Sequence, residues 1–302
     1  MKIVFMGTPD FAVPCLQRLI DEGYDIACVL TQPDRPVGRK QVLTPPPVKE
    51  LALKYGLEVY QPDTLKCDEA YNKLADYSAD YFVVAAYGKI LPKRILDLPK
   101  YACINVHGSI LPKYRGAAPI QWSVINGERE VGITTMLMGE GLDTGDILLI
   151  KKTELLPDET AGELFDRLSN MSPDLLIETL EQYKEGNIVP LPQNEAEATY
   201  APMLNKEMSF IDFNAAALAV HNKIRGLSPW PLAQCDIGNT RFKVFKSRVV
   251  NQKIDAPVGE AFVFEGEIAL TCGDGNLIIL EEIRPDGGKK MKSKDYLRGH
   301  SI

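Results

Sequence analysis

Three side chains suited to proton transfer and charge stabilisation lie in the middle of this 302-residue chain. Asn105 and His107 stand two positions apart at the end of an apolar run, and Asp143 lies in a glycine-flanked acidic stretch, residues 141–146. Because side chains i and i+2 of a strand point to the same face, Asn105 and His107 are predicted to share one. An amide on that face can polarise a carbonyl beside an imidazole that carries a proton. The carboxylate of Asp143 could orient the imidazole and stabilise its protonated form.

Taken one at a time, these residue types have commoner explanations. A His at a strand end usually satisfies a local hydrogen bond, and Asp favours turns for local reasons. The glycine at position 7 lacks the spacing of a dinucleotide or P-loop motif. His221 and His300 have no Cys or acidic partners at ligand spacing, and the 6 cysteines form no CxxC pair. We therefore expect no metal site, no disulfide framework and reduced thiols.

The elements that must position these residues alternate between strand and helix. Apolar runs at residues 2–7, 25–31, 80–86 and 101–106 are predicted as buried strands, with helical patterns between them and a further helix at 160–184. Such runs are typical of a doubly wound, mostly parallel, Rossmann-like sheet covered on both faces. Ligands in these sheets bind beyond the carboxyl ends of the strands. Gly7, residues 86–89 and residues 105–108 should therefore meet at one edge.

Residues 32–47 interrupt this alternation. Their prolines and glycine predict no regular structure, and their length exceeds an ordinary connection. Long loops in compact domains are usually functional or disordered. The basic residues Arg35, Arg39 and Lys40 favour function.

The last hundred residues have a different pattern. A helix is predicted at 209–225, followed by short strands at 240–245, 258–264, 267–272 and 276–283. This pattern indicates a small β-barrel of the OB type, and we predict a catalytic domain at 1–204 and a second domain at 205–302. The chain carries a net −7 charge, but residues 206–302 hold 14 Lys and Arg against 12 Asp and Glu. This weakly basic tail does not decide whether the partner is a nucleic acid. No apolar run approaches the about 18 residues of a membrane span, so we expect a cytoplasmic protein.

Through several motifs that occur together, the chain resembles one family, the folate-dependent formyltransferases. The stretches that carry this resemblance are Asn105-Val106-His107, residues 109–116 (SILPKYRG) and residues 141–145 (GLDTG). Within the family the chain most resembles the methionyl-tRNA formyltransferases, through residues 7–12, 31–36, 47–49, 86–92, 116–121 and 227–231. The match runs in order along nearly the whole chain.

The resemblance implies a reaction and assigns roles. It implies transfer of a formyl group from 10-formyltetrahydrofolate, with Asn105, His107 and Asp143 as the catalytic trio and no metal. The implied folate contacts are largely to backbone and come from two segments: Gly88, Lys89, Ile90, Leu91, Ser109, Ile110, Leu111 and Pro112. Ile90 and Leu91 would provide apolar walls for a flat heterocycle.

The implied acceptor is the methionine amino group of initiator methionyl-tRNA, and the implied protein is a monomer acting in translation initiation. Arg35, Arg39 and Lys40 are the residues that the resemblance assigns to tRNA, together with the second domain. The loop departs from a familiar version of the family, because Arg39-Lys40-Gln41-Val42 stands where a denser basic run is usual.

Three other functions stay open on the sequence. The first is a formyltransferase acting on a small amine, such as an amino-sugar nucleotide or glycinamide ribonucleotide. The second is a tRNA-binding or folate-binding protein without catalysis. The third is hydrolysis of formyltetrahydrofolate, with water in place of the amine.

Overall fold

The structure is a computed structural model that describes residues 1–38 and 40–302. The chain divides into two compact units. The first contains Met1–Ala117, Gly132–Thr153 and Phe165–Ala201, and the second contains Ala118–Val131, Glu154–Leu164 and Pro202–Ile302. Each is described by itself.

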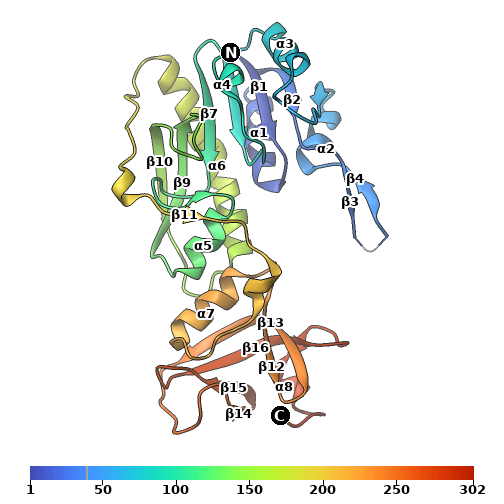
Figure 1. The fold of residues 1–302 in the computed structure, drawn as a ribbon, viewed down its shortest axis with the longest axis vertical. Helices are drawn as coiled ribbons and strands as arrows, with labels where there is room; N and C mark the ends of the chain where they lie inside the picture. Colours follow the sequence, from blue (N-terminus) through green and yellow to red (C-terminus); the bar gives the residue numbers. More distant parts are fainter. Residues whose placement is uncertain (39) are drawn as a thin grey trace. The chain divides into compact units, whose positions relative to one another are not determined.

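The first unit is built on a seven-stranded sheet of order β10-β9-β7-β6-β1-β2-β5 (Figure 1). Its strands are β1 (Lys2–Gly7), β2 (Asp25–Leu30), β5 (Val59–Tyr60), β6 (Tyr81–Ala85), β7 (Ala102–His107), β9 (Glu130–Leu137) and β10 (Ile147–Glu154). Two smaller pairs are β3 (Arg35–Val37) with β4 (Val42–Thr44), and β8 (Arg115–Gly116) with β11 (Tyr200–Ala201). The helices are η1 (Asp10–Ala12), α1 (Val13–Asp21), α2 (Pro47–Lys54), α3 (Asp68–Asp76), α4 (Lys93–Leu96), α6 (Ala161–Lys184, of which the part from Phe165 onward belongs to this unit) and η2 (Glu195–Glu197).

The predicted doubly wound, mostly parallel sheet is confirmed. Strands β5, β2, β1, β6 and β7 pair in parallel, and only β9 runs antiparallel to β7 among the pairings described. Val4 and Met6 of β1 share a buried cluster with α3 and α4. The alternate residues Ile3 and Phe5 are buried as well and point to the opposite face.

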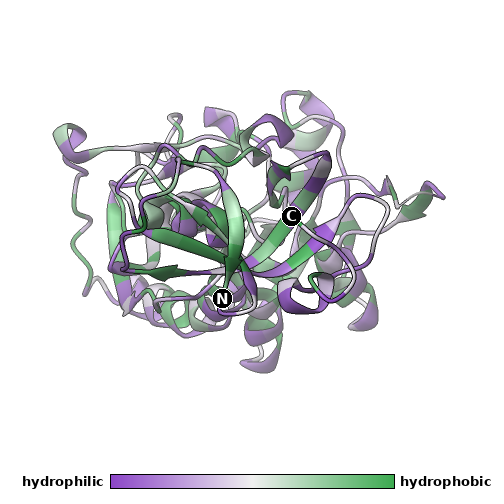
Figure 2. Cartoon of the chain, turned by 90° about the horizontal axis from the view of Figure 1, so that it is seen from below, coloured by the Kyte–Doolittle hydropathy of each residue, from purple (hydrophilic) through white to green (hydrophobic). Residues whose placement is uncertain are grey.

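Helices α1 and α6 belong to that opposite face. The Cys15 thiol of α1 lies 3.1 Å from the Ser172 hydroxyl of α6, and the hydroxyls of Thr135 in β9 and Thr179 in α6 are 2.8 Å apart. Both faces of the sheet are therefore covered, which explains why its strands are apolar on both sides. Figure 2 colours the strands mainly as hydrophobic and the outer turns of the helices mainly as hydrophilic.

The prediction that residues 32–47 lack regular structure is wrong. Strands β3 and β4 form an antiparallel hairpin in which Pro36 pairs with Leu43. Proline is tolerated there because a two-stranded ribbon needs no second hydrogen-bonded neighbour on its outer edge. Gly38 and Gln41, with φ of 73° and 51°, shape the turn.

The second unit contains one antiparallel sheet of order β12-β13-β16-β15-β14, with β17 added to β16. Its strands are β12 (Ala233–Ile237), β13 (Thr240–Val250), β14 (Ala261–Phe264), β15 (Glu267–Thr271), β16 (Leu277–Pro285) and β17 (Met291–Lys292). Its helices are α5 (Pro119–Ile125), η3 (Lys206–Ser209), α7 (Ala217–Gly226) and α8 (Ser293–Tyr296). One face packs on α7 through Val220, Ile224 and Leu227. This curled sheet confirms the predicted small β-barrel class in its half-barrel form.

The predicted helix at 209–225 begins later than expected, at Ala217. The Asp212 carboxylate accepts a hydrogen bond from the Asn214 backbone N–H at 3.0 Å. This local turn satisfies the backbone in a non-helical form, which is the usual reason that Asp and Asn delay a helix.

Among the described residues no helix has the length and apolarity needed to cross a bilayer. No group of three His, Cys, Asp or Glu side chains within residues 1–38 and 40–302 is arranged to hold a metal ion.

Two leucines in helices of the first unit test the assignment of buried faces. Leu16 in α1 is fully buried, whereas Leu53 in α2 is 57% exposed. Leu16→Ala should reduce the free energy of unfolding by about 2–5 kcal/mol, since it leaves a cavity. Leu53→Ala should cost less than about 1 kcal/mol, as expected for an exposed helical position. Urea denaturation of both variants measures the difference, and equal losses would contradict the assigned layers.

Candidate active site

Strand β7 ends in the two residues that the sequence singled out. Asn105 pairs in register with Val84 of β6 and Met136 of β9, and His107 with Thr134 of β9. Both side chains are nearly buried, with 8% and 5% exposure. Neighbouring strands β1, β6 and β7 are parallel, so their carboxyl ends lie at one edge of the sheet, as predicted.

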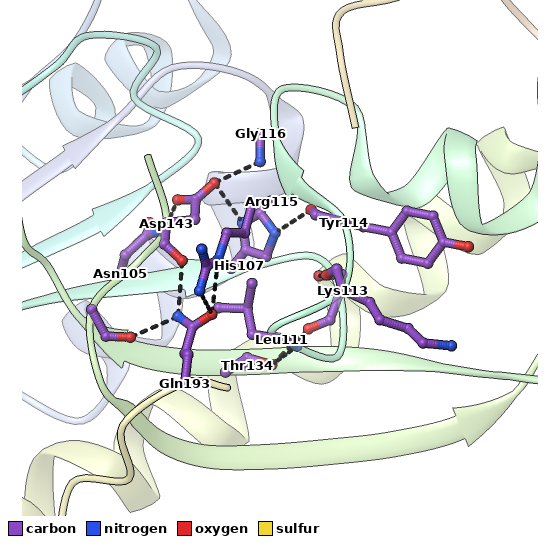
Figure 3. A network of polar contacts seen from close by, with 12 residues as sticks. Asn105, His107, Leu111, Lys113, Tyr114, Arg115, Gly116, Thr134, Asp143 and Gln193 are labelled. Atoms are coloured by element: carbon purple, nitrogen blue, oxygen red, sulfur yellow. Dashed lines mark hydrogen bonds and ion pairs between the residues drawn. The ribbon is translucent and has the colours of Figure 1, made fainter. Parts of the chain in front are cut away.

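The carboxylate of Asp143 lies against both side chains (Figure 3). One carboxylate oxygen, Oδ1, is 3.5 Å from Asn105 Nδ2, and Oδ2 is 3.6 Å from His107 Nδ1. The Gly116 backbone N–H donates to Oδ2 at 2.8 Å. The structure thus brings the predicted trio together. The Asp143 carboxylate makes a short contact to the Gly116 backbone and longer contacts to the Asn105 amide and the His107 imidazole.

A backbone carbonyl fixes which nitrogen of His107 exchanges a proton. Nε2 lies 2.9 Å from the Tyr114 carbonyl oxygen. A carbonyl oxygen only accepts, so Nε2 carries a hydrogen and donates it. The proton that comes and goes is therefore the one on Nδ1, on the side of Asp143. Tyr114 rather than Asp143 makes the short hydrogen bond that orients the ring, a feature not predicted from the sequence.

The segment after β7 is held by hydroxyl groups. Thr134 Oγ1 accepts from the Leu111 backbone N–H at 3.1 Å and donates to the Ser109 carbonyl at 2.7 Å. The Ser109 hydroxyl donates to the Lys113 carbonyl at 2.6 Å. Ser109 and Leu111 are buried, and Ile110 and Pro112 are partly exposed. Four of the eight predicted folate residues are thus held in a rigid loop beside His107.

The other four lie just after β6. Lys89 donates through its amine to the carbonyl oxygens of Pro62 and Asp63, the latter at 2.8 Å. Partial burial lowers the pKa of this amine below its ordinary value. Leu91 is buried, whereas Ile90 is 79% exposed, and Gly88 has φ of 79°. Of the two predicted apolar walls, therefore, only Ile90 is open to a ligand.

The predicted tRNA residues lie on the hairpin of β3 and β4. Arg35 is exposed in β3 and donates to the Gln32 side-chain oxygen at 3.4 Å. Lys40 is exposed in the turn. Arg39 lies outside the described residues. The hairpin also exposes Val37, Val42 and Leu43.

One group of residues near the trio was not predicted. Gln193 donates to the backbone carbonyls of Asp143 and Gly145, and its own oxygen accepts from Arg115, which is also paired with Glu195. Arg115, which lies in the sequence motif 109–116, could have indicated this group, since a charged residue beside a predicted site needs a partner. Gln193 lies about 50 residues beyond Asp143, in a segment without periodic pattern, and gave none.

Comparison with known proteins shows the family. The formyl transferase model matches residues 1–180, and the model of the formyl transferase C-terminal domain matches residues 203–301. The chain therefore belongs to the formyl transferase family, whose fold it has. It is 49% identical over 303 residues to the methionyl-tRNA formyltransferase of Caldanaerobacter subterraneus subsp. tengcongensis, with 100% of this chain and 98% of that protein covered. For the methionyl-tRNA formyltransferase of Clostridioides difficile the identity is 48% over 305 residues, with 100% and 98% covered. Within the family the chain belongs to the methionyl-tRNA formyltransferases.

Solved structures with the same fold are more distant in sequence. A sugar 3N-formyl transferase determined in the presence of dTDP and 5-N-formyl-THF superposes with a TM-score of 0.70 at 22% identity, covering 92% of this chain and 96% of that one. An N-formyltransferase from Helicobacter canadensis, in complex with folinic acid and dTDP-3-aminofucose, gives 0.69 at 20% identity, covering 96% and 100%. At these identities the likeness shows the fold alone.

Gly116 offers a test of the contact that holds Asp143. Its φ is 120°, and an added β-carbon would lie 2.8 Å from the Ala201 carbonyl oxygen. Gly56 also has a positive φ, 68°, but no atom within 4 Å of the same position. Gly56→Ala should cost about 1 kcal/mol of unfolding free energy through backbone strain alone. Gly116→Ala should cost clearly more, because the β8–β11 pairing must shift as well.

Denaturant titration of both variants separates these two effects. Equal losses of unfolding free energy at the two positions would mean that β11 can move away from the added β-carbon without cost. The hydrogen bond from the Gly116 N–H to Asp143 would then not require glycine.

Proposed function

We propose that this chain transfers a formyl group from 10-formyltetrahydrofolate to the amino group of methionine on initiator methionyl-tRNA, in translation initiation. Relatives that bear the name methionyl-tRNA formyltransferase and are 46–49% identical over the whole chain support this proposal. The observation that supports the mechanism is that the Asn105 amide and the His107 imidazole both lie against the carboxylate of Asp143. Because the proposed acceptor takes part in translation, we also propose that the protein is cytoplasmic. We propose further that the protein acts as a monomer.

The donor supplies a formyl carbon attached to a nitrogen leaving group. Transfer forms a bond from the amine nitrogen to that carbon, breaks its bond to N10 of the folate, and moves one proton from the amine to N10. Negative charge develops on the formyl oxygen, and the Asn105 amide can donate to it. With Nε2 tied to the Tyr114 carbonyl, Nδ1 of His107 is the atom that takes the proton from the amine or donates to the oxygen.

The loose contacts of the trio suit this role. Distances of 3.5 and 3.6 Å from the carboxylate to the amide and the imidazole exceed an ordinary hydrogen bond. Such contacts at catalytic groups often tighten only when the substrate is bound. Asp143 would then hold the ring and balance its charge while the proton moves.

The donor would bind along the two segments after β6 and β7. We propose Gly88, Lys89, Ile90 and Leu91 on one side and Ser109, Ile110, Leu111 and Pro112 on the other. The exposed Ile90 side chain fits contact with a flat apolar ring. Because the Lys89 amine is bonded to two carbonyl oxygens, Lys89 would contribute through its backbone.

The acceptor would be held mainly through its phosphates. We propose Arg35, Arg39 and Lys40 for this contact, with residues 205–302 as a second tRNA-contacting domain. Arg35 and Lys40 are both exposed on the hairpin, as phosphate contacts require.

Replacement of His107 tests the catalytic role. His107→Ala should reduce kcat by about 10²–10⁴-fold, since the proton carrier is lost. The KM for charged tRNA should change little, because phosphate contacts lie elsewhere. Steady-state formylation with labelled formyl donor measures both constants. Leu53→Ala, at an exposed position outside the proposed catalytic, folate and tRNA segments, is the control and should match the parent. A His107 variant with unchanged kcat would overturn the mechanism.

The nature of the acceptor is tested by competition and by salt. Initiator methionyl-tRNA should be formylated in preference to charged elongator methionine tRNA, with no product from uncharged tRNA or an amino-sugar nucleotide. The KM for this tRNA should rise steeply with salt. The double variant Arg35→Ala/Lys40→Ala should have a higher KM, and its slope of log KM against log salt concentration should be smaller by about one to two, since about one unit is lost with each phosphate contact. Lys184→Ala, exposed at the end of α6, is the control. A flat salt response with good use of the sugar nucleotide would favour a small-amine formyltransferase instead, and rapid formate release without tRNA would favour hydrolysis.

A further inference from the structure

We propose that Gln193, held by Arg115, is a positioning residue that fixes the turn carrying Asp143 and thereby sets the rate of formyl transfer. This inference rests on the proposed function and adds to it a residue outside the trio. The residues involved lie within the first unit and are drawn together in Figure 3.

The Asp143 turn is in a conformation that must be held from outside. Asp143 has φ of 51°, in the left-handed region, which costs free energy for a residue with a β-carbon. At Gly145 an added β-carbon would lie 1.8 Å from the Leu137 carbonyl oxygen. The turn is therefore pressed against β9 on one side. Its carboxylate is tied by the Gly116 N–H, but that bond does not fix the backbone from which the carboxylate extends.

The amide of Gln193 fixes that backbone. Nε2 donates to the Asp143 carbonyl at 2.8 Å and to the Gly145 carbonyl at 2.7 Å. Both hydrogens of one NH₂ group are used, so one side chain joins the two ends of the left-handed turn. No other side-chain type of this size offers two donors and an acceptor in that arrangement.

The direction of the amide is set by Arg115. Gln193 Oε1 accepts from Arg115 Nε at 3.0 Å and from Nη2 at 2.8 Å. A flipped amide would put its NH₂ group against a guanidinium and its oxygen against two carbonyls, which are repulsive contacts. The guanidinium therefore allows only the orientation in which Nε2 faces the turn.

Arg115 is itself immobilised. Its side chain has no exposed surface, and it makes paired bonds to Glu195 at 2.8 and 2.9 Å. The guanidinium also lowers the pKa of the Glu195 carboxyl below its ordinary value. A buried guanidinium needs its partners, since an unpaired buried charge is strongly unfavourable. Arg115 is also the residue before Gly116, so one short strand, β8, holds both the carboxylate and the amide that aligns it.

Loss of the Gln193 donors should act on the rate and not on substrate binding. Displacement of a catalytic group by about 1 Å can cost on the order of 10²-fold in rate. Gln193→Met keeps the length of the side chain but removes both hydrogen-bonding functions. We expect kcat to fall about 10–100-fold, with KM for charged tRNA and for the formyl donor within about threefold of the parent.

A double-mutant cycle separates positioning of Asp143 from general weakening of the fold. Asp143→Asn alone should lower kcat strongly, and adding Gln193→Met to it should lower kcat by less than about twofold further, because the residue being positioned is already disabled. A purely structural role would give the same factor in both backgrounds, and that result would overturn the inference. Gln182→Met, at a partly exposed position of α6 outside the proposed folate and tRNA segments, is the matched control and should leave kcat unchanged.

Two further results complete the test. Gln193→Glu keeps an acceptor for Arg115 but replaces the NH₂ group, with its two donor hydrogens, by one oxygen that is repelled by the Asp143 and Gly145 carbonyls, so it should lose kcat like Gln193→Met. If it retains kcat, the donors do not matter and the inference is wrong. An impaired Asp143→Asn with an active Gln193→Met overturns only this inference, whereas a fully active Asp143→Asn overturns the proposed function together with it.

Discussion

The site depends on backbone groups that fix the carboxylate and the imidazole independently of each other. In this protein the Gly116 N–H makes the short contact to Asp143, and the Tyr114 carbonyl makes the short contact to His107. Each partner is thus fixed by backbone from the same loop, while the distance between them stays at 3.6 Å. That division leaves the imidazole and the carboxylate oriented but not locked together, so a reacting group can take part between them. The parallel pairing of β1, β6 and β7, the tight loop after β7 and the turn after β9 all serve this one arrangement.

The sequence was sufficient where a local pattern sets the structure. The apolar runs that became β1, β2, β6 and β7 are buried on both faces, so their composition identifies them without reference to the rest of the chain. The i, i+2 spacing of Asn105 and His107 follows from strand geometry alone. The hairpin at β3 and β4 was missed because proline and glycine signals exclude most regular structure but not a two-stranded ribbon.

The parts of the site that the sequence did not disclose depend on contacts between distant segments. The orientation of His107 depends on a backbone carbonyl, which every residue has and no residue type reveals. The segment of Gln193 is held near Asp143 by the bridge of Leu191 with Ile147 and by the pairing of β11 with β8, and such short pairings leave almost no trace in composition. Resemblance to the formyltransferases could transfer the trio residue by residue, but a second layer of polar contacts has no short motif to carry it.

The position of Gln193 along the chain has a consequence for biosynthesis. Asn105, His107, Arg115 and Asp143 are all synthesised before it, and α6 (Ala161–Lys184) separates them from it. A nascent chain that has reached only the end of α6 has all the strands of the large sheet but not all of their packing partners: it lacks Gln193 and Glu195, which pair with the Arg115 guanidinium, and β11, which pairs with β8. Since domains fold as they emerge from the ribosome, the loop that carries Arg115 can reach its native contacts only after residues 193–201 have been added. Completion of the proposed catalytic site is thus tied to a late segment of its own unit and not to the strands that carry Asn105 and His107.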